Sequence, residues 1–283
     1  MKSNPIGVFD SGVGGLTVYK ALRGQFPHEN FVYLGDTARL PYGTKSADTV
    51  EQYAVQAAKF LVNEEIKLLV IACNTASALA LPGLQRMLPT LPLVDVILPS
   101  ARTAALTTQN NRIAVMATES TVRSAAYAKT IKMFNPKASV EMLPCNLLVA
   151  LAEEGWCEGR EAEMVVGRYL NQLEEGFDTL VLGCTHFPLL TPVIRKLVGH
   201  KVTIIDSASA VTKSVETFLK SRELFNPQQR PGNAEFHVTD SPERFGKLAK
   251  RFLNTDIADN IAFAYLSPNS KDQMQPTKTA KAS

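Results

Sequence analysis

Short runs of apolar residues recur along the chain, and the stretches between them mix apolar and polar side chains at helical spacing. Nearly continuous apolar runs of this length are typical of strands buried on both faces of a parallel sheet. Residues 46–64 and 160–173 carry apolar side chains three and four positions apart and are predicted to be helices. The pattern predicts strands at residues 6–9, 31–34, 68–72, 93–96, 113–116, 140–143, 180–183 and 202–205. This alternation predicts an α/β fold with parallel sheets covered by helices.

Composition, length and charge limit the kinds of protein that this sequence can encode. The 283 residues are 45% hydrophobic and 20% charged, as in ordinary globular proteins, and the length suggests two domains. A net charge of +3 is too small to predict a nucleic-acid-binding surface. The sequence contains neither an apolar stretch long enough to span a membrane nor a signal-peptide core. We therefore expect a cytoplasmic protein with no nucleic-acid or membrane partner.

The end of the chain differs from the rest. Residues 266–283 are rich in Ser, Thr and Lys and lack apolar periodicity. We expect this segment to be a disordered tail, because it offers no apolar face to bury.

The cysteines fall into two groups. Their spacing fits neither a disulfide framework nor a structural zinc site. A cysteine in such a protein is usually a small buried apolar residue, and Cys145 and Cys157 fit that description. Cys73 and Cys184 do not, because each follows a predicted strand within an internal repeat: residues 67–75 resemble residues 178–186.

The repeat places the two cysteines where ligands bind in this class of fold. In open α/β sheets, the ligand crevice lies at the carboxyl ends of the strands. Backbone N–H groups at a strand-to-helix turn are expected to lower the pKa of a thiol and favour the reactive thiolate. We therefore expect Cys73 and Cys184 to be reactive, one in each lobe.

Several chemistries could use two such thiols. A redox couple is one, although redox pairs usually lie two residues apart on one turn. A zinc site of Cys73, Cys184 and His186 is another, but no fourth ligand is evident. A Cys–His hydrolase would leave Cys73 unexplained. Two opposed thiols best suit a symmetric reaction, in which a proton leaves one face of a carbon and another is returned to the opposite face, as in racemisation.

Two loops after predicted strands are further candidates. The glycine-rich loop at residues 10–15 could cradle a phosphate, but its spacing fits no nucleotide motif. Alternatively its glycines let backbone amides approach a small carboxylate, with Ser11 as a hydrogen-bond donor. Asp10 could cap a helix, orient an ammonium group or adjust a thiol. The loop at residues 35–43 offers Tyr42 as an aromatic wall.

Two other positions have both a structural and a catalytic interpretation. Glu153 and Glu154 end a predicted helix before Gly155, where solvent-exposed side chains are common. His186 could be a structural hydrogen-bonding residue. Next to a candidate catalytic thiol, it could instead assist proton transfer or favour the thiolate.

Four motifs taken together resemble the bacterial glutamate racemases of the aspartate/glutamate racemase family. Their order and spacing match from about residue 5 to residue 265. The motifs are IGVFDSGVGGLTV at residues 6–18, YLGDTARLPYGTKS at 33–46, IACNTAS at 71–77 and LGCTHFPL at 182–189. The resemblance implies a cofactor-independent isomerase that interconverts L- and D-glutamate, needs no metal, and supplies D-glutamate for peptidoglycan synthesis. A homodimer is also compatible with it.

The resemblance also implies roles for individual residues. It carries Cys73 over as the base acting on D-glutamate and Cys184 as the base acting on L-glutamate. Asp10 and His186 match assisting positions beside the two thiols, and Glu153 matches a third. The implied substrate contacts are Asp10, Ser11, Tyr42, Gly43, Asn74, Thr75, Thr185 and His186.

The resemblance further implies a discontinuous arrangement of two lobes. The first would comprise residues 1–97 with 208–265, and the second residues 98–207, with the active site between them. Asp95 departs from the family, in which glycine is usual at this position, and a local change in the geometry between the lobes is expected there.

Two alternatives stay open at this point. The same two-thiol chemistry could act on aspartate, because the sequence does not show the depth of the pocket. A non-catalytic module that closes on an amino acid or a phosphate is the second alternative, and it would need neither thiol.

Overall fold

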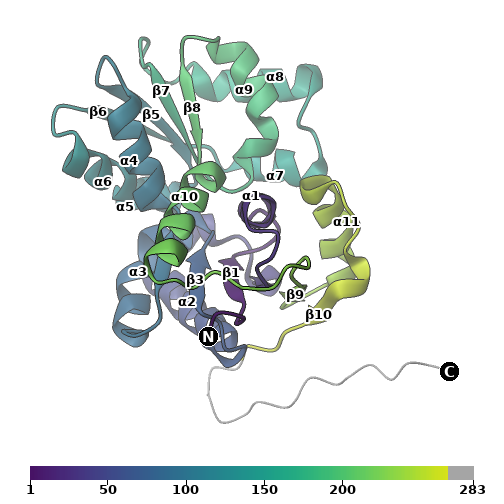
Figure 1. Cartoon of the computed structure of the whole chain (residues 1–283). Helices are drawn as coiled ribbons and strands as arrows, with labels where there is room; N and C mark the ends of the chain where they lie inside the picture. The colour runs from purple at the N-terminus through teal and green to yellow at the C-terminus, as the bar shows by residue number, and fades with distance from the viewer. Residues whose placement is uncertain (267–283) are drawn as a thin grey trace.

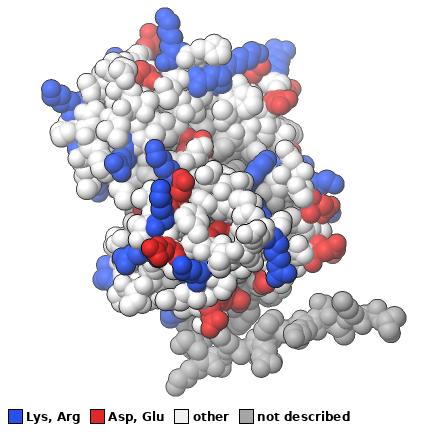
Figure 2. Space-filling model, viewed as in Figure 1, with Lys and Arg blue, Asp and Glu red and all other residues white. Residues whose placement is uncertain are grey.

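The computed structural model describes residues 1–266, so the predicted tail lies outside the described residues apart from Leu266. The described chain forms two α/β units, each built on a parallel sheet with helices on both faces (Figure 1). The predicted fold class is confirmed. No helix within the described range is long and apolar enough to cross a membrane. On the face shown in Figure 2, basic and acidic side chains are interspersed.

The larger sheet has the strand order β10-β9-β2-β1-β3-β4, and all its pairings are parallel. Alternate residues of β1 face opposite sides, so Val8 packs against α1, α10 and α11 while Phe9 packs against α2 and α3. The strands are β1 Ile6–Asp10, β2 Phe31–Gly35, β3 Leu68–Ile71, β4 Leu93–Asp95, β9 Ala234–Val238 and β10 Ile261–Phe263. The helices are α1 Leu16–Gln25, α2 Ala47–Asn63, α3 Asn74–Met87, α10 Ser207–Ser221 and α11 Pro242–Leu253.

The smaller sheet has the order β6-β5-β7-β8 and is also parallel. Met116 faces α7, α8 and α9, while Val115 faces α4 and α6. The strands are β5 Arg112–Ala117, β6 Ser139–Pro144, β7 Thr179–Gly183 and β8 Thr203–Asp206. The helices are α4 Ile97–Thr107, α5 Glu119–Ser124, α6 Ala126–Phe134, α7 Leu147–Glu154, α8 Gly159–Leu170 and α9 Thr191–Val198. Short 3₁₀ turns are η1 Thr37–Arg39, η2 Tyr42–Thr44, η3 Phe187–Leu190 and η4 Ala258–Asn260.

Each predicted strand is confirmed to within one residue at either end, and so are the helices α2 and, apart from its last turn, α8. Strands β9 and β10 were not predicted. In β9 the apolar residues alternate with Glu235 and His237, and β10 is only three residues long with two exposed side chains. Strand β10 lies at the edge of the sheet and β9 lies next to it. Neither has the continuous apolar run that identifies a buried strand.

Asp95 has a structural role where the chain passes from the larger sheet to the smaller one. Its Oδ1 atom accepts hydrogen bonds from the backbone N–H groups of Ile97 at 2.8 Å and Leu98 at 2.9 Å. The carboxylate therefore satisfies donors in the first turn of α4, as a side-chain cap does. Burial raises the pKa of Asp95, whereas these hydrogen bonds oppose the shift.

Candidate active site

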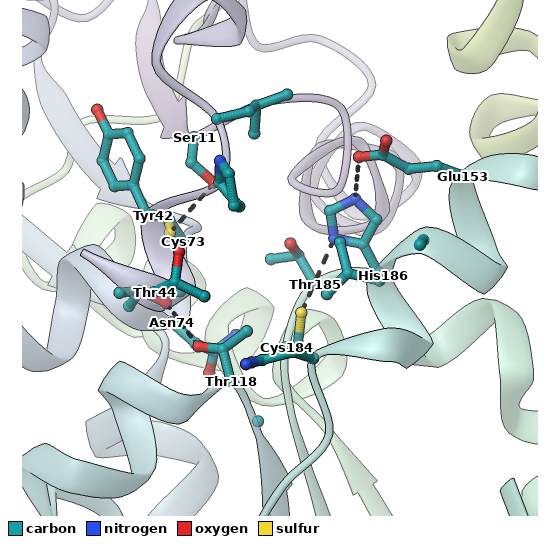
Figure 3. Close-up of a pocket in the computed structure, with 18 residues that line it drawn as sticks. Ser11, Tyr42, Thr44, Cys73, Asn74, Thr118, Glu153, Cys184, Thr185 and His186 are labelled. Atoms are coloured by element: carbon teal, nitrogen blue, oxygen red, sulfur yellow. Dashed lines mark hydrogen bonds and ion pairs between the residues drawn. The ribbon is translucent and has the colours of Figure 1, made fainter. Parts of the chain in front are cut away.

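One cavity of about 290 Å³ lies where the carboxyl ends of the two parallel sheets face each other. The segments that line it each follow a strand: β1, β2, β3, β5, β6 or β7. Such strand ends are the usual ligand site of open α/β sheets. Figure 3 shows the sulfur atoms of Cys73 and Cys184 on either side of this space.

Cys73 occupies the cap position of helix α3, directly after β3. Its sulfur accepts a hydrogen bond from the backbone N–H of Ala76 at 3.4 Å and donates to the Ser11 hydroxyl at 3.6 Å. The expected lowering of its pKa is wrong. Burial raises the pKa of Cys73 to about 12, the nearby charge of Asp10 adds to the effect, and the Ala76 N–H only partly offsets it. Cys73 is therefore a neutral thiol at pH 7.

Cys184 follows β7 and has a different set of partners. Its sulfur lies 3.8 Å from Nδ1 of His186, and Nε2 of the same ring lies 3.1 Å from Oε1 of Glu153. Figure 3 shows these three side chains in line along one wall of the cavity. Helix α7 ends at Gly155, whose left-handed backbone stops the helix and leaves Glu153 in its last turn.

The charge of His186 follows from these contacts. Burial alone would lower its pKa, but the hydrogen bonds to Cys184 and Glu153 and the charge of Asp10 outweigh burial and raise the pKa to about 10. The hydrogen bond to His186 also lowers the pKa of Glu153. The imidazole is therefore protonated at neutral pH and donates through both ring nitrogens. The protonated ring of His186 therefore faces the sulfur of Cys184 as a hydrogen-bond donor.

Asp10 lies behind the cavity rather than on its wall. It is fully buried, and its Oδ2 accepts from the backbone N–H of Gly12 at 2.9 Å. Its Oδ1 accepts from the Thr185 hydroxyl at 3.4 Å, so Asp10 is hydrogen-bonded on the Cys184 side and not to Cys73. Burial raises the pKa of Asp10, and the charge of His186 opposes that shift.

The glycine-rich loop brings the two sheets together. A Cβ added at Gly14 would lie 2.3 Å from Oγ1 of Thr185 and 2.5 Å from the His186 ring, so only glycine permits this approach. Among the loop residues 10–15, Ser11 alone lines the cavity. No glycine of this loop lines the cavity, and the predicted approach of the loop amides to a carboxylate stays a prediction. The spacing of the glycines also allows the loop to pack against the strand end that carries Cys184.

Several side chains that line the cavity can donate hydrogen bonds. Oδ1 of Asn74 accepts from the Tyr127 hydroxyl at 2.7 Å, whereas Nδ2 of this buried residue has no hydrogen-bond partner within the described range. The Thr75 hydroxyl lies 2.9 Å from that of Thr118, which belongs to the other sheet's unit. These groups offer hydrogen bonds to an anionic ligand, and an unpaired buried amide is costly unless a ligand satisfies it.

Tyr42 is held by a buried carboxylate. Its hydroxyl donates to Oδ2 of Asp36, which also accepts from Nε of Arg39 at 2.6 Å, while Oδ1 accepts from Thr239 at 2.8 Å. Burial raises the pKa of Tyr42, and the negative charge of Asp36 adds to this effect, so the phenol stays neutral. The loop that carries Tyr42 and Gly43 is thereby fixed at the cavity.

The structure brings nearly all of the predicted site residues together. Asp10 alone lies behind the wall, and Glu154 is exposed whereas its neighbour Glu153 lines the cavity. Those on the wall are Ser11, Tyr42, Gly43, Cys73, Asn74, Thr75, Glu153, Cys184, Thr185 and His186. Sequence reasoning missed Thr118 and Asn146, although each closely follows a predicted strand, and that position is the signal that could have identified them.

The cysteines and acidic residues do not form other kinds of site in the described part of the chain. All four cysteines are free thiols. Across residues 1–266, no three His, Cys, Asp or Glu side chains are grouped so that they could hold a metal ion.

Comparison with known proteins bears on what this cavity does. Residues 6–215 match the family described as Asp/Glu/Hydantoin racemase. The chain is 49% identical over 255 residues to the glutamate racemase of Geobacter metallireducens, which covers 90% of this chain and 94% of that protein.

Solved structures agree with the sequence matches. The glutamate racemase of Francisella tularensis in complex with D-glutamate has a TM-score of 0.89 and 37% identity, covering 95% of this chain and all of that one. A glutamate racemase isoform of Bacillus anthracis has a TM-score of 0.90 and 35% identity, and the match covers 94% of this chain and 99% of that one. The resemblance inferred from the four motifs is confirmed. The chain is a racemase, and hence an isomerase, and it belongs to the Asp/Glu/Hydantoin racemase family.

Proposed function

We propose that this protein is a glutamate racemase in which Cys73 and Cys184 exchange protons with opposite faces of the α-carbon. The observation that carries the proposal is the position of the two thiols on opposite sides of one cavity. Glutamate rather than aspartate is favoured by the names of the relatives, which are glutamate racemases at 40–49% identity.

The proposed reaction balances without a cofactor. From L-glutamate, the Cys184 thiolate takes the α-proton, so a C–H bond breaks and an S–H bond forms. The Cys73 thiol then gives its proton to the opposite face, so its S–H bond breaks and a new C–H bond forms. From D-glutamate the same steps run in reverse, and Cys73 must first become the thiolate.

Removal of the α-proton requires strong stabilisation of the negative charge that develops, because an amino-acid α-proton is far less acidic than a thiol. Negative charge that develops during proton removal extends onto the α-carboxylate. The buried amide Nδ2 of Asn74 and the hydroxyls of Thr75 and Thr118 are available to hold a carboxylate group. Fixed donors in a cavity closed to water stabilise such charge more than water does.

His186 and Glu153 are proposed to assist Cys184. The protonated ring of His186 donates to the sulfur, and Glu153 stabilises the positive charge of the ring. Asp10 is proposed to act on this set through Thr185 and through its charge. Ser11, which lines the cavity, is proposed to orient the substrate's ammonium group.

Substrate entry is proposed to require separation of two lobes, residues 1–97 with 208–265 and residues 98–207. The cavity is closed by hydrogen bonds between these parts, such as the one from Ser120 to the Lys45 carbonyl at 2.8 Å and the contact between Thr75 and Thr118. Opening of the cavity requires such contacts to break.

Supply of D-glutamate for peptidoglycan, a cytoplasmic location and a homodimer are proposed from the family resemblance. Rescue of a D-glutamate-requiring bacterial strain tests the first, fractionation of cells tests the second, and light scattering of the purified protein tests the third.

Proton exchange tests the proposed activity directly. The purified protein is incubated with L- or D-glutamate in deuterated water, and the α-hydrogen is followed by NMR while the optical rotation is recorded. We expect each enantiomer to take up deuterium at the α-carbon as it is converted into the other. A protein that binds glutamate but exchanges no α-hydrogen would be the non-catalytic module.

A further inference from the structure

The His186–Glu153 pair is contacted from outside its own unit by helix α11. This helix packs on the larger sheet through Phe245, Ala249 and Phe252, whereas α7, which carries Glu153, packs on the smaller sheet. Figure 1 shows the C-terminal part of α11 next to the end of α7. Contacts at this point therefore cross from one unit to the other.

Two consecutive residues of α11 contact the two members of the pair. Nη1 of Arg251 donates a hydrogen bond to the backbone carbonyl of Glu153. The ring of Phe252 meets the ring of His186 edge-on, with 5.7 Å between the centroids and 87° between the planes. The backbone carbonyl of Phe252 accepts from Nζ of Lys20 at 3.2 Å, which fixes the end of α11 against α1.

The end of α7 is shaped to receive Arg251. Carbonyl groups in the last turn of a helix lack partners within the helix, and a cationic side chain there also favours the negative end of the helix dipole. Gly155 follows this turn, and a Cβ added there would lie 3.2 Å from the guanidinium carbon of Arg251. The glycine therefore lets the guanidinium lie against the helix end that carries Glu153.

We propose that Arg251 is a positioning residue for the Cys184 half of the reaction. By holding the backbone of Glu153, Arg251 fixes the distance between the Glu153 carboxylate and Nε2 of His186. The orientation of the His186 ring is thereby fixed, and with it the position of Nδ1, the donor that faces Cys184. Arg251 does not line the cavity, and Cys73 has no contact with α11 in the described chain. Its effect is therefore confined to one of the two bases. This inference rests on the proposed two-thiol reaction.

Arg251 suits a substitution test because its side chain is exposed and contributes nothing to the buried core. Arg251→Met keeps the length of the side chain and removes the donor, and Arg251→Lys keeps a cationic donor. Lys247→Met is the matched control, because Lys247 is an exposed cation one turn earlier on α11 and has no hydrogen bond or ion pair among the described residues.

The assay uses the L and D forms of 3-chloroglutamate, which lose chloride after removal of the α-proton and so need only one base. The C–H electron pair forms the new C=C bond, chloride leaves with its bonding pair, and the resulting enamine is hydrolysed by water to 2-oxoglutarate and ammonia. Release of 2-oxoglutarate is measured for each enantiomer, together with the melting temperature of each variant.

We expect Arg251→Met to lower kcat for the L form about tenfold, the size expected when one hydrogen bond to a charged donor is lost. The D form should change less than about twofold, KM and melting temperature should stay near those of the parent, and Arg251→Lys should recover most of the lost rate. Lys247→Met should match the parent protein for both forms.

Equal losses for the L and D forms in Arg251→Met, or no loss for either, would overturn the assignment of Arg251 while leaving the two-thiol reaction intact. A loss in Lys247→Met as large as that in Arg251→Met would overturn it too, because the effect would then belong to the charge of α11. A parent protein that releases 2-oxoglutarate from neither enantiomer would instead overturn the proposed function.

Discussion

Cys73 and Cys184 follow strands with similar sequences, yet the surroundings of their sulfur atoms differ. Cys73 begins helix α3 and has only a hydroxyl and a backbone N–H as partners, and burial raises its pKa to about 12. Cys184 faces His186, whose pKa is raised to about 10 by its contacts with Cys184 and Glu153 despite burial. At neutral pH the sulfur of Cys73 is therefore a neutral thiol, whereas the sulfur of Cys184 faces the protonated ring of His186.

The comparison shows that the sequence repeat places both cysteines at the cavity but does not determine the surroundings of their sulfur atoms. Both cysteines lie at the cavity because each closely follows a parallel strand, β3 or β7. The surroundings that differ are burial and the charge of Asp10 for Cys73, and the contact with His186, itself held by Glu153, for Cys184. Under the proposed reaction, removal of an α-proton by Cys73 first requires loss of its own thiol proton.

Removal of either thiol should have the largest effect. Cys73→Ala and Cys184→Ala should each lower racemisation by at least about a thousandfold, because no other side chain can exchange a proton with that face. Both side chains are small, so circular dichroism spectra and the cooperative unfolding transition should be preserved. Near-normal turnover by either variant, measured by polarimetry, would contradict a reaction with two bases.

Removal of the imidazole should distinguish the two halves. His186→Asn should lower elimination from L-3-chloroglutamate by about a hundredfold, the range typical of a lost acid–base partner, and should affect the D form much less. Asn cannot carry the positive charge that faces the sulfur of Cys184. If the D form lost as much as the L form, His186 would serve both thiols and the comparison would need revision.

The pH dependence of elimination should reveal the same difference without a substitution. The Cys73 thiolate becomes about tenfold more abundant for each pH unit below its pKa of about 12, whereas His186 stays protonated until pH approaches about 10. The ratio of kcat/KM for D-3-chloroglutamate to that for L-3-chloroglutamate should therefore rise by up to about a hundredfold between pH 7 and 9. Titration of the substrate amino group cancels in this ratio. A ratio that falls with pH would mean that Cys73 is the more acidic thiol.

Much of this architecture was predictable because it depends on local pattern. Buried parallel strands need continuous apolar runs, and the runs ending at Asp10 and Cys73 show where a crevice must lie. Burial could not be predicted, and for Cys73 it reverses the expected effect of a helix N-terminus on the pKa. Contacts between distant segments could not be predicted from the sequence either, such as those of Gly14 with Thr185 and of Arg251 with Glu153.

Serine at each cysteine position tests the assignment of the two faces most directly. Serine keeps the size of the side chain and one donor, but its hydroxyl is a far poorer source of an anion. Elimination from L- and D-3-chloroglutamate is measured for both variants. The account predicts that Cys73→Ser loses the D reaction and retains the L reaction, and that Cys184→Ser does the reverse. Equal losses of both reactions in both variants would contradict it, because the thiols would then act as one coupled unit.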